Sequence, residues 1–184
     1  MKSKVIYILL GSLIAILAVY FALDGLGVFE PEEIQPKEVS WTKQQSTNLG
    51  KELAIEQELD IKIFLEGHKD WNMVTTGSGL RYEILEHGEG DSIRAGDRAE
   101  IEYEIRQLDG TLCTKTESDE YEEFDVDKSE IESGIQEGIK YLCVGDRARF
   151  IMPSHLAHGL VGDMNKIPPL TILLVEIKVL GKVK

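Results

Sequence analysis

Two features of this sequence hold residue types that could do chemistry: the loop 153–169 and the tyrosine at position 103. Gly159 and Gly162 let the loop bend sharply, and a Pro-Pro pair stiffens its exit before the apolar run 170–180. Such a loop can form a rigid flap over one end of an apolar pocket. A tyrosine in a strand, on its buried face, needs a hydrogen-bond partner for its hydroxyl.

Covalent and metal chemistry have little support in the sequence. It contains no nucleophile elbow, phosphate-binding loop or zinc-site spacing. His155 and His158 stand three residues apart, after Cys143, but no acidic or thiolate partner follows at a fixed spacing, so we expect hydrogen-bonding loop residues. The acidic segment 117–127 lacks the spacing and the central glycine of an EF-hand, so we expect a solvated loop. We therefore expect no metal and no cofactor.

The charge balance excludes one class of partner. The chain has 33 acidic and 20 basic residues and a formal net charge of -13. This excess repels phosphates, so we expect no nucleic-acid partner. Cys113 and Cys143 could form one disulfide outside the cytoplasm, but sequence alone does not place them within bonding distance.

The N-terminus has the pattern of a membrane segment. Residues 1–4 are basic, and residues 5–23 are almost wholly apolar and uncharged, which is nearly enough for a helix to cross a bilayer. The segment is either a cleaved signal or an uncleaved anchor; because it lacks an A-x-A cleavage pattern, we expect an anchor. Lysines before the span and acids after it predict a cytoplasmic N-terminus and an outward-facing domain. In a bacterium, this describes a single-pass protein of the cell membrane with its domain in the periplasm.

A linker and a helix should separate the anchor from the compact domain. Residues 24–39 contain prolines among acids and indicate an extended linker. Residues 40–67 have a helical pattern that ends at Gly67. Its apolar face is expected to hold Leu49, Leu53, Leu59, Ile63 and Phe64. That face could pack on its own domain, the simpler interpretation, or mediate dimerisation with a second chain.

Residues 77–184 should form an α+β domain. Apolar residues alternate with polar ones, or form an apolar run, in six expected strands: 80–84, 99–105, 111–116, 124–126, 148–152 and 171–180. Asp109-Gly110 predicts a type I′ hairpin turn. Ser129 to Glu132 has the pattern of a capping box, followed by an apolar stripe at helical spacing. We expect a curled antiparallel sheet wrapped on one short helix, with the last strand central.

The domain resembles FKBP-type peptidyl-prolyl isomerases over residues 80–180. The resemblance rests on four segments in the family's order: Tyr103 with Leu108-Asp109-Gly110, residues 130–138, Val144 to Ala148, and residues 153–169. It implies a proline-binding pocket lined by Tyr103, Phe124, Ile131, Glu132, Ile135, His158, Ile167 and Val175, with the Glu132 backbone N–H holding a substrate carbonyl. The residues it implies for catalysis are Tyr103, Cys113, Thr114 and His158.

The chain departs from the family's pattern at several walls of that pocket. His158 replaces a tyrosine, Ile135 a floor tryptophan and Val175 an aromatic residue. Cys113 and Thr114 stand where the family has a Phe-Asp pair. The pocket should therefore be wider and less aromatic, and isomerase activity on short peptides should be weak.

Two functions are consistent with this resemblance. The first is a peptidyl-prolyl isomerase that assists folding of exported or envelope proteins by favouring the twisted state of an X–Pro amide, whose barrier is ~18–20 kcal/mol. The second is a non-enzymatic chaperone or assembly factor that binds polypeptides. Both would act on proline-containing clients. The segment Trp71 to Tyr82 and the sequence Leu156-Ala157-His158-Gly159 further resemble envelope FKBPs of the gliding-motility-associated type.

Overall fold

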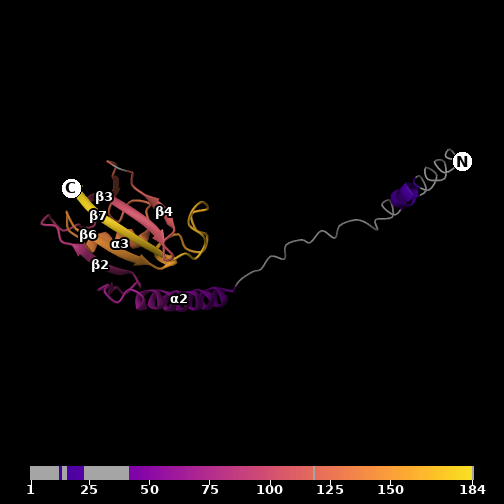
Figure 1. Ribbon diagram of the computed structural model, residues 1–184, viewed down its shortest axis with the longest axis horizontal. Helices are drawn as coiled ribbons and strands as arrows, with labels where there is room; N and C mark the ends of the chain where they lie inside the picture. The colour runs from indigo at the N-terminus through magenta and orange to yellow at the C-terminus, as the bar shows by residue number, and fades with distance from the viewer. Residues whose placement is uncertain (1–12, 14–15, 23–41, 118, 184) are drawn as a thin grey trace. The chain divides into compact units, whose positions relative to one another are not determined.

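The computed structural model describes residue 13 and residues 16–22, 42–117 and 119–183. Most of the predicted anchor 5–23 and all of the predicted linker 24–39 lie outside these ranges. Across the described ranges, no helix has the length and apolar character needed to cross a membrane. The chain divides into a unit of residues 1–41 and a unit of residues 42–184, and the second unit contains the folded domain (Figure 1).

Seven strands of the described chain form one antiparallel sheet. Their order is β1-β2-β6-β7-β3-β4, and β5 also pairs with β3. The strands are β1 (Val74–Thr75), β2 (Arg81–Glu86), β3 (Arg98–Gln107), β4 (Leu112–Lys115), β5 (Glu122–Asp125), β6 (Arg147–Met152) and β7 (Leu173–Val183). The predicted antiparallel sheet and the central position of the last strand are confirmed, because β7 pairs with both β3 and β6.

Strand alternation gives the sheet two different faces. Along β7, Leu173, Val175, Ile177 and Val179 are buried on one face, while the residues between them are less buried. This period of two is the pattern of a pleated strand with one core-facing side. Bulges interrupt the register in three strand pairs and add local bend, which suits a curled sheet.

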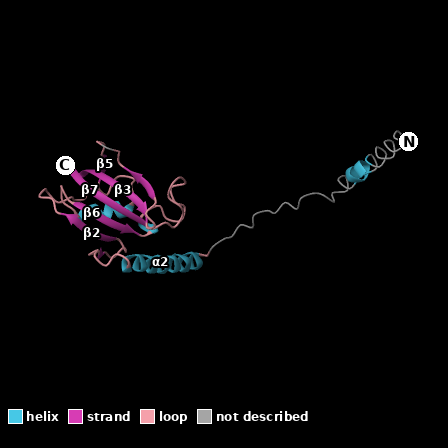
Figure 2. Ribbon diagram, viewed as in Figure 1, coloured by secondary structure: helices cyan, strands magenta, loops and turns pink. Residues whose placement is uncertain are grey.

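The concave face of the sheet holds the short helix α3 (Ser133–Gly138), which continues as a 3-10 turn, η1 (Ile139–Tyr141) (Figure 2). Ile135 and Ile139 are buried in the main core, where they join strand residues such as Phe150 and Ile177. The predicted capping box is wrong. The N-cap is Glu132, which makes no side-chain capping bond. The Ser129 hydroxyl instead accepts a bond from the Asp125 N–H at 2.8 Å.

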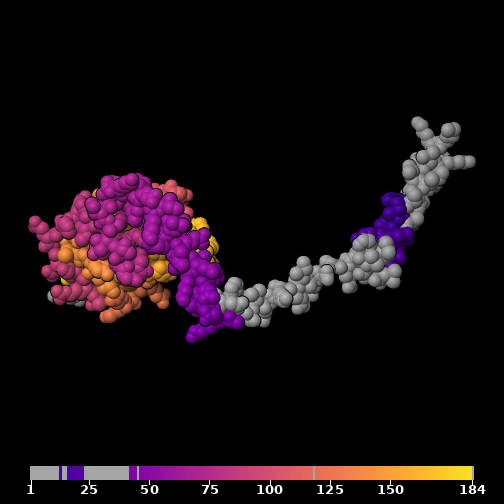
Figure 3. All heavy atoms as spheres, turned by 90° about the horizontal axis from the view of Figure 1, so that it is seen from below, coloured from indigo at the N-terminus to yellow at the C-terminus, as the bar shows by residue number. Residues whose placement is uncertain are grey.

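The long helix α2 (Lys43–Glu66) covers the opposite face of the sheet. Ile61 is fully buried against Ile151 and Ile172, and the ring of Trp71 joins this second cluster. The helix therefore packs on its own domain through its C-terminal half. Residues 43, 44 and 46–52 are exposed, and Figure 3 shows α2 running over the domain surface.

The predicted apolar face of α2 is wrong in part. Leu49, Leu59 and Ile63 are 38, 56 and 58% exposed. The buried side instead centres on Gln57 and Ile61, so the helix meets the domain along a narrower stripe than its apolar pattern suggested. The apolar residues outnumber the positions that the sheet can cover, and the surplus remains in solvent.

The turn between β3 and β4 also differs from its prediction. Among its two signal residues only Gly110 has a positive φ, of 90°, whereas a type I′ turn needs two. Gln107 donates its N–H to the Thr111 carbonyl, and Gly110 donates to the Gln107 carbonyl. This is a three-residue connection with a left-handed glycine, the other common hairpin geometry. The hairpin itself is confirmed.

Candidate polypeptide-binding cleft

Three adjoining cavities form one cleft beside the N-terminus of α3. Their volumes are about 60, 210 and 530 Å³. They adjoin because Glu132 lines all three, while Tyr103 and His158 each line two. We call this set the cleft. Strands β3 and β5 form one side, the start of α3 the base, and the loop 153–169, here called the flap, the opposite side.

The smallest cavity is an apolar hollow at the end of the core. It is lined by Ile101, Tyr103, Ile105, Thr114, Glu122, Phe124, Ile131, Glu132 and Ile135. Alternation along β3 places Ile101, Tyr103 and Ile105 on the same face. Phe124 comes from the paired strand β5, and Ile135 closes the bottom from α3. A small apolar group can be received here without strong competition from water.

The Tyr103 hydroxyl has the partner that its buried position requires. It donates to the Glu122 carboxylate at 3.2 Å. Burial raises the pKa of Tyr103 to about 12, and the neighbouring Glu122 and Glu132 carboxylates add to this shift. The phenol therefore stays protonated at any physiological pH, and its O–H is held by Glu122 at the wall of the hollow.

A contact between a histidine and a carboxylate spans the cleft from the helix to the flap. His158 Nε2 lies 3.0 Å from Glu132 Oε1, with side chains 28 and 18% exposed. Both residues line the two larger cavities. The backbone N–H of Glu132 has no recorded acceptor within the described part of the chain, so it can donate to a bound carbonyl.

The flap owes its shape to one carboxylate and one glycine. Asp163 Oδ1 accepts the N–H of Ile167 at 2.7 Å and that of Asn165 at 2.9 Å. These bonds lower the pKa of Asp163 and fix the turn. Gly162 has a φ of 73°, and a Cβ there would collide with the Ile167 carbonyl at 2.1 Å. The predicted need for glycine in this loop thus has a definite steric cause.

The structure brings most of the predicted site residues to the cleft. Those lining the apolar hollow are Tyr103, Thr114, Phe124, Ile131, Glu132 and Ile135. Those lining the 210 Å³ cavity include Cys113, Thr114, Glu132, His158 and Ile167. Val175 lines none of the three cavities and is fully buried in the core. Cys113 and Cys143 are both free thiols, so they do not form a disulfide with each other. Cys113 is buried, and burial raises the pKa of its thiol.

Three carboxylates of the cleft escaped the sequence reasoning. Glu122 was assigned to a solvated acidic loop, and Glu130 and Asp163 received no role. A signal for Glu122 was present: it stands two residues before Phe124, and alternation in a strand puts both on one face. The density of acids around it concealed that pattern.

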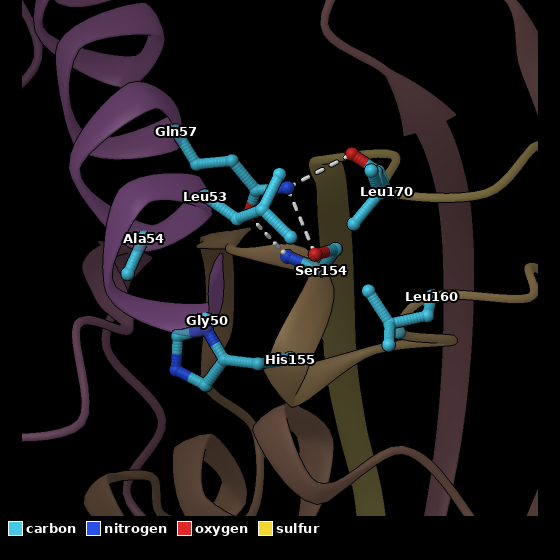
Figure 4. A pocket seen from close by; sticks show the side chains of 9 residues that line it. Gly50, Leu53, Ala54, Gln57, Ser154, His155, Leu160 and Leu170 are labelled. Carbon is cyan, nitrogen blue, oxygen red and sulfur yellow. Dashed lines mark hydrogen bonds between the residues drawn. The ribbon is translucent and has the colours of Figure 1, made fainter. Parts of the chain in front are cut away.

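A separate hollow of about 320 Å³ lies between α2 and the base of the flap. Figure 4 shows Leu53, Gln57 and Ser154 around it, with Leu160 and Leu170 from the flap side. It contains none of the residues of the cleft. Its walls are largely aliphatic, and its polar side chains are His155 and the pair Gln57 and Ser154 that joins α2 to the flap.

The fold and the cleft together define a class of protein. An antiparallel sheet that curls over one short helix, with an apolar hollow at the helix N-terminus under a long flap, is an FKBP-like α+β architecture. The structure thus confirms the fold class expected for the domain.

Comparisons with known proteins support the same class. Residues 90–180 match the family described as FKBP-type peptidyl-prolyl cis-trans isomerase. A probable FKBP-type peptidyl-prolyl cis-trans isomerase FkpA of Neisseria meningitidis is 35% identical over 56% of this chain and 38% of its own length. A probable FKBP-type isomerase of Haemophilus influenzae is 28% identical over 81% of this chain and 60% of its own.

Solved structures agree. A peptidyl-prolyl cis-trans isomerase from Pseudomonas syringae pv. tomato matches with a TM-score of 0.60 and 25% identity, covering 72% of this chain and 96% of that one. The C-terminal domain belongs to the FKBP-type peptidyl-prolyl cis-trans isomerase family. The chain spans about 40 to 60% of the length of the curated relatives named above.

Proposed function

We propose that this protein is a peptidyl-prolyl cis-trans isomerase that acts on proline-containing polypeptides. The observation that carries the proposal is the apolar hollow at Tyr103, Phe124 and Ile135, with the unpaired Glu132 N–H at its edge. The relatives are named as isomerases of this type, which supports the same activity here.

The proposed mechanism needs no covalent step. A planar X–Pro amide is more polar than the twisted one, because twisting removes resonance. The hollow would receive the proline ring and exclude water, which favours the twisted state. The Glu132 N–H would hold a flanking carbonyl, and preferential binding of the twisted amide would lower the barrier.

We propose further that the protein works in the bacterial envelope. The apolar run 5–23 would anchor it in the cell membrane, with the domain in the periplasm. Its clients would be exported or envelope proteins. A relationship to gliding-motility-associated isomerases is part of this proposal and is supported by the motifs around Trp71 and Ala157.

A second candidate function is binding without efficient catalysis. The widening predicted from the sequence is not seen at the apolar hollow, which measures about 60 Å³, far below the roughly 300–1,000 Å³ of ordinary ligand pockets. The floor of the hollow is the aliphatic Ile135, and the adjoining 210 Å³ cavity is lined by the small side chain of Cys113. We therefore propose weak turnover on short peptides, and the alternative is a chaperone or assembly factor that holds chains.

The test is a protease-free isomerisation assay on X–Pro tetrapeptides, together with refolding of a protein limited by proline isomerisation. We expect measurable acceleration by the native chain and its loss in Tyr103→Ala. The control is Tyr141→Ala, because Tyr141 stacks on Tyr82 and lines no cavity of the cleft. No acceleration by the native chain, with peptide binding retained, would favour the binding function. Absence of both would refute the proposal.

A paired variant separates the two functions further. Cys113→Phe with Thr114→Asp rebuilds the pair that the family has at these positions. A large gain in turnover, with binding unchanged, would identify the native protein as mainly a binder. A small gain over an active native protein would support the enzyme.

A further inference from the structure

We propose that the cleft selects proline segments with a lysine or arginine beside the proline, and that Glu122 and Glu132 determine this specificity. The inference rests on the proposed function, since it names the substrate class of the same cleft. It follows from where these two carboxylates stand relative to the hollow, and from what else lines the cleft.

The two carboxylates border the path of any bound chain. Glu132 lines all three cavities, and its side chain is only 18% exposed. Glu122 lines the hollow and the 530 Å³ cavity, and it accepts the Tyr103 hydroxyl at 3.2 Å. A chain with its proline in the hollow must place the neighbouring residues in the larger cavities, within reach of both.

The charges that face the cleft are unbalanced. Its ionisable lining, apart from Tyr103 and Cys113, consists of Glu122, Glu130, Glu132, Asp163, His158 and Lys166. Four carboxylates against one lysine and one histidine give a local charge of -3 with the histidine neutral and -2 with it protonated. The cleft is therefore anionic in either state.

The existing partners of these carboxylates leave most of that charge uncompensated. Glu122 is bonded to a neutral phenol, and Asp163 to backbone N–H groups. Glu132 has His158, and Glu130 has no partner in the described chain. A cation on the ligand would supply the missing charge, whereas an acidic ligand residue would meet repulsion, most strongly at the partly buried Glu132, since Glu122 and Glu130 are exposed.

Two partly exposed ion pairs, each worth about two- to fivefold in a binding constant, set the expected size of the effect. Kinetically, kcat/KM should fall from Lys to Gln to Glu beside the proline, with about tenfold between the extremes at low salt. The ratio of kcat/KM between the Lys and Glu peptides should shrink severalfold in 0.5 M NaCl, because the Debye length falls to a few ångströms.

The experiment uses the full chain in a nonionic detergent and tetrapeptides with Lys, Gln or Glu on either side of the proline. Turnover is measured without protease, and binding of the same peptides, fluorescently labelled, is measured by anisotropy. Glu122→Gln with Glu132→Gln should reduce the Lys-over-Glu preference to less than threefold. The matched control, Glu66→Gln with Glu89→Gln, removes the same charge outside the cleft and should keep the preference.

The outcomes separate this inference from the proposed function. Equal turnover of all peptides would overturn the inference and leave the isomerase standing. An equal loss of preference in the control pair would also overturn it, because the selectivity would then come from the net charge of the whole molecule. If no peptide is turned over, the isomerase proposal fails, and the anisotropy decides: a Lys preference supports the specificity of the cleft, and its absence refutes it.

Discussion

The attachment of α2 to the flap depends on one buried amide, Gln57. Its Oε1 accepts the Ser154 N–H at 2.9 Å, and its Nε2 donates to the Ser154 hydroxyl at 2.8 Å and to the Leu170 carbonyl at 2.9 Å (Figure 4). Gln57 is 7% exposed and Ser154 is 5% exposed. We therefore choose Gln57→Ala as the perturbation.

The magnitude follows from the groups left behind. The Ser154 N–H loses its acceptor in a buried position, which costs about 1–3 kcal/mol. The Leu170 carbonyl belongs to a residue that is 37% exposed, so water can replace its donor at small cost. With the lost hydroxyl bond at about 1 kcal/mol, the free energy of unfolding should fall by about 2–4 kcal/mol.

Urea unfolding followed by tryptophan fluorescence measures this change. A loss of ~3 kcal/mol lowers the midpoint by ~1–3 M, since urea slopes are ~1–3 kcal/mol/M for small proteins. Glu56→Ala is the control, because Glu56 is the exposed neighbour on the same helix. Hydrogen exchange at the Ser154 amide should accelerate only in the Gln57 variant. A difference from the control below ~0.5 kcal/mol would show that water entering the adjacent 320 Å³ hollow replaces the amide.

Two further predictions concern the cleft wall and two helical glycines. Spectrophotometric titration should show one tyrosine ionising near pH 12, namely Tyr103; Glu122→Gln should lower this pKa only in part, because burial is its largest cause. Since the folded pKa exceeds the ordinary value of 10.0, stability contributed by this group is intact below pH 10 and is lost as the pH rises toward 12, a decline that Tyr103→Phe should remove. Gly138→Ala should destabilise the folded domain by about 1–3 kcal/mol, because the added Cβ would meet the buried Phe150 ring at 2.6 Å. Gly50→Ala in α2 should stabilise it by about 0.5–1 kcal/mol, because the added Cβ has open space. Thermal unfolding of both variants measures the two effects. Equal effects of the two glycine variants, or a Tyr103 that titrates near 10, would contradict these assignments.

The sheet was predictable because each strand carries its own period. Alternation along 99–105 depends on local sequence and on one buried face, so the pattern survives without knowledge of the neighbours. The face of α2 was not predictable to the same degree. Leu59 and Ile63 are as apolar as Ile61, and only the shape of the sheet beneath decides which of them is covered.

Turn and cap chemistry failed for a related reason. Asp109-Gly110 specifies that a hairpin forms, but the choice between two- and three-residue connections depends on the register of β3 against β4. Ser129 matches a capping pattern, but in the turn after β5 its hydroxyl accepts the Asp125 N–H instead of a helix N–H. Short polar side chains serve whichever backbone group the fold brings nearest, and a linear pattern cannot rank these candidates.

The candidate site shows where the family resemblance reaches its limit. The family resemblance identifies wall positions such as Tyr103 and Phe124, and the structure places both side chains in the lining of the hollow. Glu122 also lines the hollow and Glu130 lines the largest cavity, but an acidic stretch looks the same in a sequence whether it faces solvent or a ligand. In this chain the fold does not dictate the carboxylates of the cleft or the bonds that Gln57 makes to the flap. Differences from its relatives in substrate choice and in flap stability should therefore arise from these carboxylates and from α2. Substitutions at these positions should change substrate choice and flap stability without altering the sheet.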